Sequence, residues 1–288
     1  MAALEKTTPN MAGKVCLVTG GNSGIGRETT LGLARLGATV VIVSRDRAKG
    51  EAALSEIKRQ SGNENVDLLV AELSSLDSVR QLAQEFRGKY SKLHVLVNNA
   101  GVFLPRRFVT ADGFESTFAT NHLGHFLLSN LLLDVLKASA PARVINVTSD
   151  AHKGAQIDFE DLMGEKKFSG FKAYGQSKLA NVLFTYQLAK LLDGTGVTVN
   201  CLHPGVVRTG FGKDAGGLFA IGVRIVGPFM MSPQKSAKAA VYLATAPELE
   251  EVTGKHFSKS KEEKSSAESY DQVTAERLWQ VSAELTRL

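Results

Sequence analysis

The chain has 288 residues, of which 43% are hydrophobic, so it is long enough to bury one large core. Its net charge of +5 comes from lysines and arginines scattered among acids, which argues against nucleic acid as a partner. The two cysteines, Cys16 and Cys201, lie inside apolar runs without a metal-ligand spacing, and they predict buried thiols in a reducing compartment instead of a disulfide.

Apolar strand-type runs alternate with amphipathic helix-length runs along the chain, the pattern of a parallel sheet covered on both faces. No internal repeat and no Pro/Ser-rich linker interrupts the pattern, so we expect one doubly wound α/β domain at 12–288 after a flexible tail at 1–11. Strands are expected at 14–20, 39–45, 66–73, 94–101 (including the exit loop), 143–149 and 197–205. Helices are expected at 24–36, 46–60, 75–90 and 112–138, and the helix that carries Tyr174 should end near residue 192.

The loop between the first strand and the first helix reads TGGNSGIGRE and contains Gly20, Gly24 and Gly26. Glycines let the backbone approach a pyrophosphate closely, and a helix N-terminus offers unpaired N–H groups with a favourable dipole. At the head of a strand–helix–strand unit, this pattern predicts a Rossmann-type dinucleotide site. A glycine-rich turn without a ligand is the alternative.

The end of the second strand indicates which dinucleotide is bound. NAD sites usually place an acid here to bind the ribose 2′-hydroxyl, whereas an arginine accommodates a 2′-phosphate. This chain has Ser44 followed by Arg45, with Arg47 close by, and Asp46 is placed to cap the next helix. The pattern favours NADP(H), the alternative being that Arg45 is an ordinary surface charge.

Tyr174 and Lys178 stand four positions apart in FKAYGQSKLANV (171–182), a stretch with helical character. That offset stacks two side chains on one helix face, about 6 Å apart along the axis. A neighbouring ammonium favours the phenolate and lowers the phenol pKa from its usual value near ~10. The pair is therefore a candidate proton-transfer unit, with an aromatic anchor beside a solvated lysine as the alternative.

Together with the glycine loop, Asn98-Asn99-Ala100-Gly101, Ser149 and the Tyr174–Lys178 pair make residues 12 to about 257 resemble a short-chain dehydrogenase/reductase. Within that superfamily the chain is most similar to the retinol dehydrogenases and their relatives. The resemblance implies an NADP(H)-dependent oxidoreductase that interconverts a hydrophobic aldehyde or ketone and its alcohol, such as retinal and retinol. It is carried by TNHLGHFLL (120–128), SAPARVINVTS (139–149), SKLANVLFT (177–185), TGVTVNCLHPGVVRT (195–209) and TAERLWQVSAEL (274–285).

The same resemblance implies a catalytic tetrad of Asn121, Ser149, Tyr174 and Lys178. Tyr174 would protonate the carbonyl oxygen as hydride arrives, or act as the base in reverse, and Lys178 would lower its pKa and hold the cofactor ribose. Ser149 would stabilise the charge that develops on the substrate oxygen. Asn121 would hold a water that links Lys178 to solvent. Without the family pattern, Asn121 would be a helix residue bonding nearby backbone and Ser149 a turn residue.

Cofactor contacts implied by the resemblance come from the loops that follow the strands. Glu72 stands where relatives usually have Asp and would reach the adenine amino group, while Val207 and Thr209 would meet the nicotinamide carboxamide. Pro204 and Gly205 are also a strand-terminating turn in any case. The full set is Gly20, Asn22, Ser23, Gly24, Ile25, Gly26, Arg45, Glu72, Leu73, Asn99, Ala100, Gly101, Tyr174, Lys178, Pro204, Gly205, Val207 and Thr209.

Other candidate residues receive structural interpretations. His122, His125 and His203 lack partners at a metal spacing, so polar helix or loop roles and no metal are expected. His152 should meet substrate or solvent. The apolar stretch 216–231, interrupted by Arg224, predicts a substrate lid at about 208–231, with core packing or shallow membrane contact as alternatives. The charged run 259–269 should be a solvated loop.

The expected partner is an apolar small molecule, while peripheral membrane contact and a homo-oligomer stay open. The first ten residues contain no apolar run, which predicts neither signal peptide nor membrane span there and favours a cytoplasmic location. Two other functions stay open: reduction of another lipid or pigment carbonyl, and NADP(H) sensing without turnover. The tetrad argues against a sensor, which has no use for an acid, a residue that tunes its pKa and an oxyanion partner. The exact substrate, the favoured direction and the oligomeric state also stay open.

Overall fold

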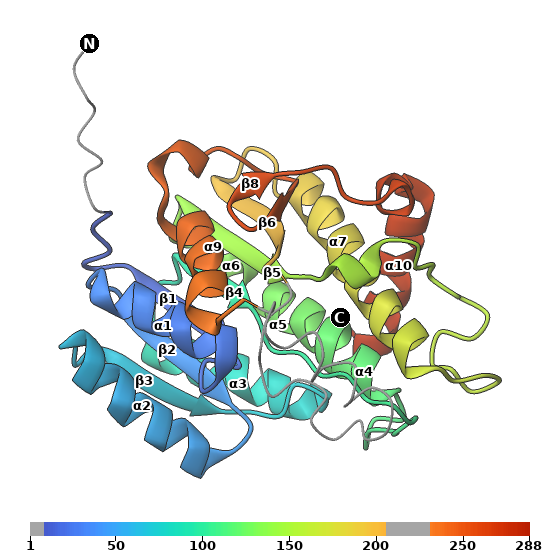
Figure 1. Ribbon diagram of the computed structural model, residues 1–288, viewed down its shortest axis with the longest axis horizontal. Helices are drawn as coiled ribbons and strands as arrows, with labels where there is room; N and C mark the ends of the chain where they lie inside the picture. The colour runs from blue at the N-terminus through green and yellow to red at the C-terminus, as the bar shows by residue number, and fades with distance from the viewer. Residues whose placement is uncertain (1–8, 206–230) are drawn as a thin grey trace.

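An eight-stranded sheet is the centre of the computed structural model, which describes residues 9–205 and 231–288 (Figure 1). The strand order is β3-β2-β1-β4-β5-β6-β7-β8; the first seven strands run parallel, and β8 pairs with β7 in the antiparallel sense. All six expected strands are confirmed. The strands are β1 (Val15–Thr19), β2 (Thr39–Ser44), β3 (Val66–Val70), β4 (Val95–Asn98), β5 (Ala142–Val147), β6 (Val197–His203), β7 (Lys255–Ser258) and β8 (Lys261–Glu262).

Helices cover both faces of the sheet, as the continuous apolar strands require. In β1, Cys16 and Val18 pack beneath α1 (Gly24–Arg35), α2 (Arg47–Ser61) and α9 (Pro233–Thr245). Leu17 points to the opposite core, which is covered by helices that include α3 and α7. The other helices are α3 (Leu76–Lys89), α4 (Ser116–Phe118), α5 (Gly124–Leu131), α6 (Leu133–Ala138), α7 (Gly170–Leu191) and α10 (Gln272–Thr286).

Several local predictions are confirmed. The Asp46 side chain caps α2 by accepting the N–H of Lys49 at 3.0 Å. Cys16 and Cys201 are both buried free thiols. Met11 is buried and donates its N–H to the Leu36 carbonyl, so the folded part of the chain already includes the last residue of the predicted tail.

The helix expected at 112–138 is broken into short pieces. The π turn η1 (Ala119–Leu123) separates α4 from α5, and Leu132 separates α5 from α6. The residue after the π turn must be glycine, because a Cβ added to Gly124 would lie 2.3 Å from the Leu73 carbonyl oxygen. The turn matters for the site because it contains Asn121.

The prediction that 259–269 is a solvated loop is right about exposure, since most of its residues are exposed, but wrong about the lack of regular structure. The segment contains β8 and the start of the 3₁₀ turn η6 (Ala267–Tyr270). Its Ser265 hydroxyl lies 2.6 Å from both the Tyr186 and Ser269 hydroxyls, and Ser269 is buried. A charge-rich sequence thus packs through its serines, which composition could not reveal.

Two features expected from the sequence fall wholly or mainly outside the described residues. Val207 and Thr209 lie in the range 206–230, as does all of the expected lid except Met231.

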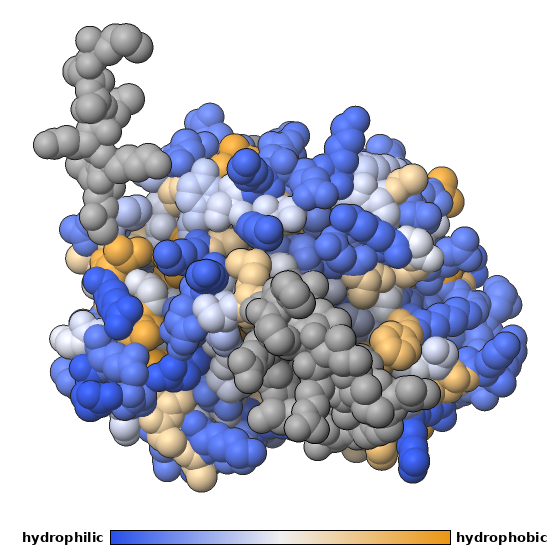
Figure 2. Space-filling view, viewed as in Figure 1, coloured by the Kyte–Doolittle hydropathy of each residue, from blue (hydrophilic) through white to orange (hydrophobic). Residues whose placement is uncertain are grey.

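Within 9–205 and 231–288, no helix has the length and apolar character needed to cross a bilayer. The face in Figure 2 is mostly hydrophilic, with apolar side chains scattered over the part that the structure describes.

Candidate active site

The predicted site residues gather at one edge of the sheet, because parallel strands all end there. Gly20 follows β1, Asn99 follows β4, Ser149 follows β5 and Pro204 follows β6. Neighbours β1–β4–β5–β6 are paired side by side. Residues separated by up to 184 positions in the sequence, from 20 to 204, therefore reach a common region.

The glycine loop needs its glycines for space and for backbone geometry. Gly20 and Gly24 have φ values of +65° and +54°, in the left-handed region that favours glycine. A Cβ on Gly26 would lie 2.3 Å from the Gly20 carbonyl oxygen and 2.4 Å from Asn99 Nδ2. The loop and the start of α1 are thus held together too tightly for any other residue at position 26.

The N-terminus of α1 fits an anionic group. Ser23 is its N-cap residue but makes no side-chain capping bond. The first N–H groups of a helix have no partner within the helix, so an anion can bind them. Asn22, Ser23 and Ile25 are exposed or half-buried around this end. These features suit the pyrophosphate of a dinucleotide.

Arg45 is exposed directly after β2, and it forms no ion pair within the described part of the chain. Arg47 instead lies 3.8 Å from Glu51, and Asp46 is occupied as a helix cap. The guanidinium of Arg45 is therefore the available cation at this strand end. Glu72 uses one carboxylate oxygen to accept the N–H of Ser74 at 3.0 Å.

The loop after β4 is tied to β1. Asn99 donates through Nδ2 to the Thr19 carbonyl at 2.8 Å, so its amide has a structural role. Gly101 faces the catalytic side: a Cβ there would lie 3.3 Å from Asn121 Oδ1 and 3.5 Å from Lys178 Nζ. Leu73, by contrast, is buried in the core.

Tyr174 and Lys178 lie on one face of α7, with Nζ 5.6 Å from the centre of the phenol ring. Lys178 is 3% exposed and donates to the Val147 carbonyl at 3.1 Å. Burial lowers the pKa of Lys178 to about 8, because it disfavours the charged form. The ammonium fraction therefore falls as the pH rises through this value.

The expected lowering of the Tyr174 pKa is wrong for the protein without cofactor. Burial raises the pKa of Tyr174 to about 12, and a hydrogen bond with the Ser149 side chain opposes this effect only in part. Lys178 Nζ donates to the Val147 carbonyl and lies 5.6 Å from the centre of the phenol ring. The phenol is thus protonated at neutral pH, which suits an acid.

Asn121 is held by protein groups on every side-chain atom that can form a hydrogen bond. Oδ1 accepts the N–H of Val102 at 2.7 Å, and Nδ2 donates to the Val102 carbonyl at 3.0 Å and to Ser177 Oγ at 2.9 Å. The side chain thus makes the backbone bonds that the alternative expected, and the catalytic role of Asn121 stays a prediction. The water between Lys178 and solvent stays a prediction.

The expectation that His152 contacts substrate or solvent is wrong. Its ring is fully buried, Nδ1 donates to the Ser149 carbonyl at 2.6 Å, and Nε2 accepts the N–H of Ser266. His203 lies 3.1 Å from Asp150, also in a structural role. In the residues that can be described, no group of His, Cys, Asp and Glu could hold a metal ion.

Two aromatic residues beside Tyr174 were not singled out from the sequence. The Phe103 ring centre lies 5.9 Å from that of Tyr174 and 5.1 Å from that of Phe171. Phe171 is 66% exposed, so the three rings lead from the surface to the phenol. The available signal was positional, since Phe171 precedes Tyr174 by three residues on one helix.

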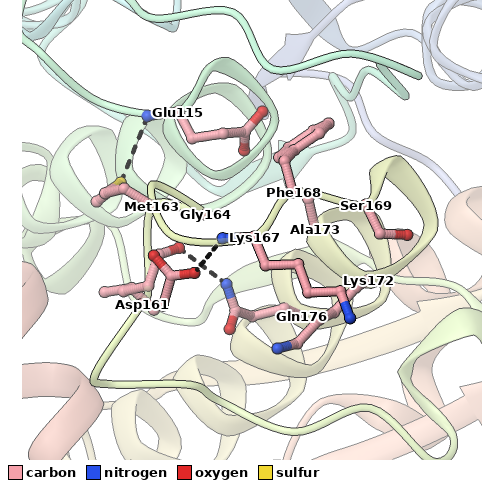
Figure 3. Close-up of a pocket in the computed structure, with 11 residues that line it drawn as sticks. Glu115, Asp161, Met163, Gly164, Lys167, Phe168, Ser169, Lys172, Ala173 and Gln176 are labelled. Carbon is pink, nitrogen blue, oxygen red and sulfur yellow. Dashed lines mark hydrogen bonds between the residues drawn. The ribbon is translucent and has the colours of Figure 1, made fainter.

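A separate hollow beside α7 is shown in Figure 3. Its lining includes Glu115, Met163 and Lys167 but no tetrad residue. Asp161 accepts the N–H groups of residues 165–167 and folds the lining loop on itself. The hollow is therefore a product of this loop and not the catalytic centre.

Comparison with known proteins agrees with this geometry. The short chain dehydrogenase family model matches residues 14–216. Retinol dehydrogenase 12 of Mus musculus is 47% identical over 279 residues, covering 97% of this chain and 88% of that protein. Retinol dehydrogenase 13 of Homo sapiens is 45% identical over 284 residues, covering 96% and 85%.

Solved structures share the fold. An uncharacterized protein from Mycobacterium paratuberculosis superposes with a TM-score of 0.79 at 34% identity, covering 97% of this chain and 95% of that one. The RhlG/NADP active-site complex of Pseudomonas aeruginosa gives 0.70 at 29% identity, covering 91% and 100%.

The chain belongs to the short-chain dehydrogenase family, and is thus an oxidoreductase that acts on CH–OH or carbonyl groups with a nicotinamide cofactor. Within that family it falls in the retinol dehydrogenase-like branch. The predicted superfamily, its branch and the doubly wound fold are confirmed.

Proposed function

We propose that the protein uses NADPH to reduce an apolar aldehyde or ketone of the retinal type, and that Asn121, Ser149, Tyr174 and Lys178 form its catalytic site. The observation that carries this proposal is the half-buried Tyr174 side chain, which is hydrogen-bonded to Ser149 beside the buried Lys178. Relatives named retinol dehydrogenases support the substrate class. The aromatic rings of Phe103 and Phe171 offer an apolar surface next to the phenol.

In this proposal each side chain has one task. Ser149 and Tyr174 donate hydrogen bonds to the carbonyl oxygen, and Tyr174 then transfers its proton to that oxygen. The nicotinamide, when bound, supplies the hydride. Lys178 stabilises the phenolate that is left, since a nearby cation favours the charged form. Oxidation of the alcohol would use the same groups in reverse.

The preference for NADP(H) is supported by Arg45 and by the engagement of Asp46 as a helix cap. A carboxylate free to bind the ribose 2′-hydroxyl would repel a 2′-phosphate. The Asp46 carboxylate instead accepts a hydrogen bond from the N–H of Lys49. Expectations of peripheral membrane contact and of a homo-oligomer stay predictions.

Purified protein is expected to oxidise NADPH when retinal is added, and to act more weakly on short polar aldehydes, because the rings beside Tyr174 favour apolar surface. Absorbance at the NADPH band measures the rate over a panel of retinal, medium-chain aldehydes and steroid ketones. Tight NADPH binding without turnover of any carbonyl would contradict the proposal and favour a sensor. Preference for another lipid or pigment carbonyl would replace the substrate class.

Arg45→Ala is expected to weaken NADPH binding by about 10-fold or more, because one charge-assisted contact to a phosphate is lost. NADH binding should change little, since it has no 2′-phosphate. Arg47→Ala is the matched control, because Arg47 is already paired with Glu51. Fluorescence titration with both cofactors measures the effect, and equal losses for NADPH and NADH would refute the role of Arg45.

A further inference from the structure

A chain of hydrogen bonds links the glycine loop to Asn121 through His125, which is buried at the start of α5. The Thr19 hydroxyl, at the end of β1, lies 2.9 Å from His125 Nε2, and Nδ1 lies 3.1 Å from the Asn121 carbonyl oxygen. The same hydroxyl oxygen accepts the N–H groups of Asn99 and Ala100 at 2.9 and 3.0 Å. One imidazole therefore joins the strand before the phosphate loop, the loop after β4 and the turn that carries Asn121.

The partners of His125 determine which ring nitrogen carries the proton. A carbonyl oxygen can only accept, so Nδ1 donates to Asn121 and Nε2 is left as an acceptor. The Thr19 hydroxyl donates to Nε2, because its other acceptor, the Val97 carbonyl, is 3.4 Å away. Burial also lowers the pKa of His125 to about 3, so the ring is neutral at physiological pH.

The hydrogen bond from His125 to the Asn121 carbonyl lies at a π turn, where the backbone hydrogen bonds of the helix are shifted. Gly124 donates its N–H to the Ala119 carbonyl, five residues earlier. The backbone hydrogen bonds around Asn121 therefore depart from the four-residue spacing of an α-helix. Such turns leave carbonyl groups without their usual helical partner, and buried carbonyls need one. His125 supplies a donor to the Asn121 carbonyl from within the same segment.

Asn121 in turn contacts the catalytic helix. Its Nδ2 donates to Ser177 Oγ at 2.9 Å, and that hydroxyl donates to the Tyr174 carbonyl at 2.8 Å. A shift of the π turn would therefore reach the backbone of Tyr174 through two hydrogen bonds.

We propose that His125 is a positioning residue that keeps Asn121, and through it α7, in register with the loops expected to bind the cofactor. The inference rests on the dehydrogenase reaction proposed above. It predicts that the neutral Nδ1–H form is required and that an aromatic ring without nitrogen atoms cannot replace it.

His122 provides a matched control, since it lies in the same segment and is also buried. Its Nε2 lies 2.9 Å from Ser282 Oγ on α10, its Nδ1 lies 3.4 Å from Asn181 Oδ1 on α7, and its ring packs against Phe118 and Phe184. Replacement of His122 should lower stability without changing the register of the site.

The test compares His125→Phe, His125→Asn and His122→Phe by melting temperature, NADPH affinity and steady-state kinetics with retinal. We expect His125→Phe to lower kcat about 10- to 100-fold, as for one or two lost buried hydrogen bonds, with a much smaller change in KM. His125→Asn should recover most of kcat, because its amide can donate to the Asn121 carbonyl from the position of Nδ1. His122→Phe should keep kcat within about threefold of wild type, even if its melting temperature falls as much as that of His125→Phe.

Nitrogen-15 spectra of the histidines in the wild type give a readout that needs no turnover. The Nδ1–H form at His125 would support the inference, and the Nε2–H form would overturn it. A wild-type kcat in His125→Phe, or losses in both Phe variants that follow melting temperature alone, would also overturn it. A wild type inert towards every carbonyl would instead count against the proposed function, and the spectra would still decide the role of His125.

Discussion

Tyr174→Phe is expected to lower kcat for carbonyl reduction by about 10³-fold, within the range that a positioned general acid contributes. The substitution removes only the hydroxyl that Ser149 contacts and that is protonated at neutral pH. The ring should stay in place against Phe103, so NADPH affinity should change little. Single-turnover measurements at saturating NADPH separate the chemical step from binding.

Tyr186→Phe controls for the loss of a tyrosine hydroxyl from the same helix. Its hydroxyl contacts Ser265 at 2.6 Å and takes no part in the site, so the cost should be about 1 kcal/mol of stability with turnover unchanged. If Tyr174→Phe kept more than about a tenth of wild-type kcat, Tyr174 would not be the proton donor.

Gly26→Ala is expected to weaken NADPH binding by about 10- to 100-fold, the equivalent of the 1–3 kcal/mol that overpacking costs. The new Cβ would meet the Gly20 carbonyl oxygen at 2.3 Å, and a backbone atom can move away only if the loop changes shape. That change displaces the N–H groups at the start of α1 from the pyrophosphate. Isothermal titration with NADPH measures the loss, and circular dichroism establishes that the variant is folded.

Gly88→Ala makes the same chemical change in α3, where an added Cβ meets nothing within 4 Å. It should leave NADPH affinity unchanged and stabilise the helix by up to about 1 kcal/mol. Wild-type affinity in a folded Gly26→Ala variant would show that the pyrophosphate does not depend on this loop.

Much of the fold could be predicted because the buried strands are continuous apolar runs between helices. Residues such as Val41 and Ile42 are buried on opposite faces of β2, so consecutive residues are apolar and the strand is easy to recognise in the sequence. β7 and β8 were not predicted, since Lys255–Ser258 and Lys261–Glu262 are short and partly charged. The helix at 112–138 was predicted as continuous, and the interruptions at 119–123 and Leu132 have no local signal in the sequence.

In the candidate site, too, positions set by local motifs could be predicted, whereas properties that depend on distant contacts could not. Motif spacing indicates the positions of Ser149, two residues after β5, and of Tyr174, on the long helix α7 that follows. The Tyr174 pKa could not be derived from the neighbouring lysine, because burial is a property of the whole fold and is here the largest effect on that pKa. His152 contacts Ser266, 114 positions away, and no local pattern predicts that contact.

The structure of the protein with NADP+ bound is the measurement that tests the central claim most directly. We expect the pyrophosphate against the backbone N–H groups of residues 20–26, the ribose near Lys178 and the reactive face of the nicotinamide opposite the Tyr174 hydroxyl. A Tyr174 hydroxyl turned away from the nicotinamide, or a pyrophosphate bound elsewhere on the sheet edge, would contradict the account.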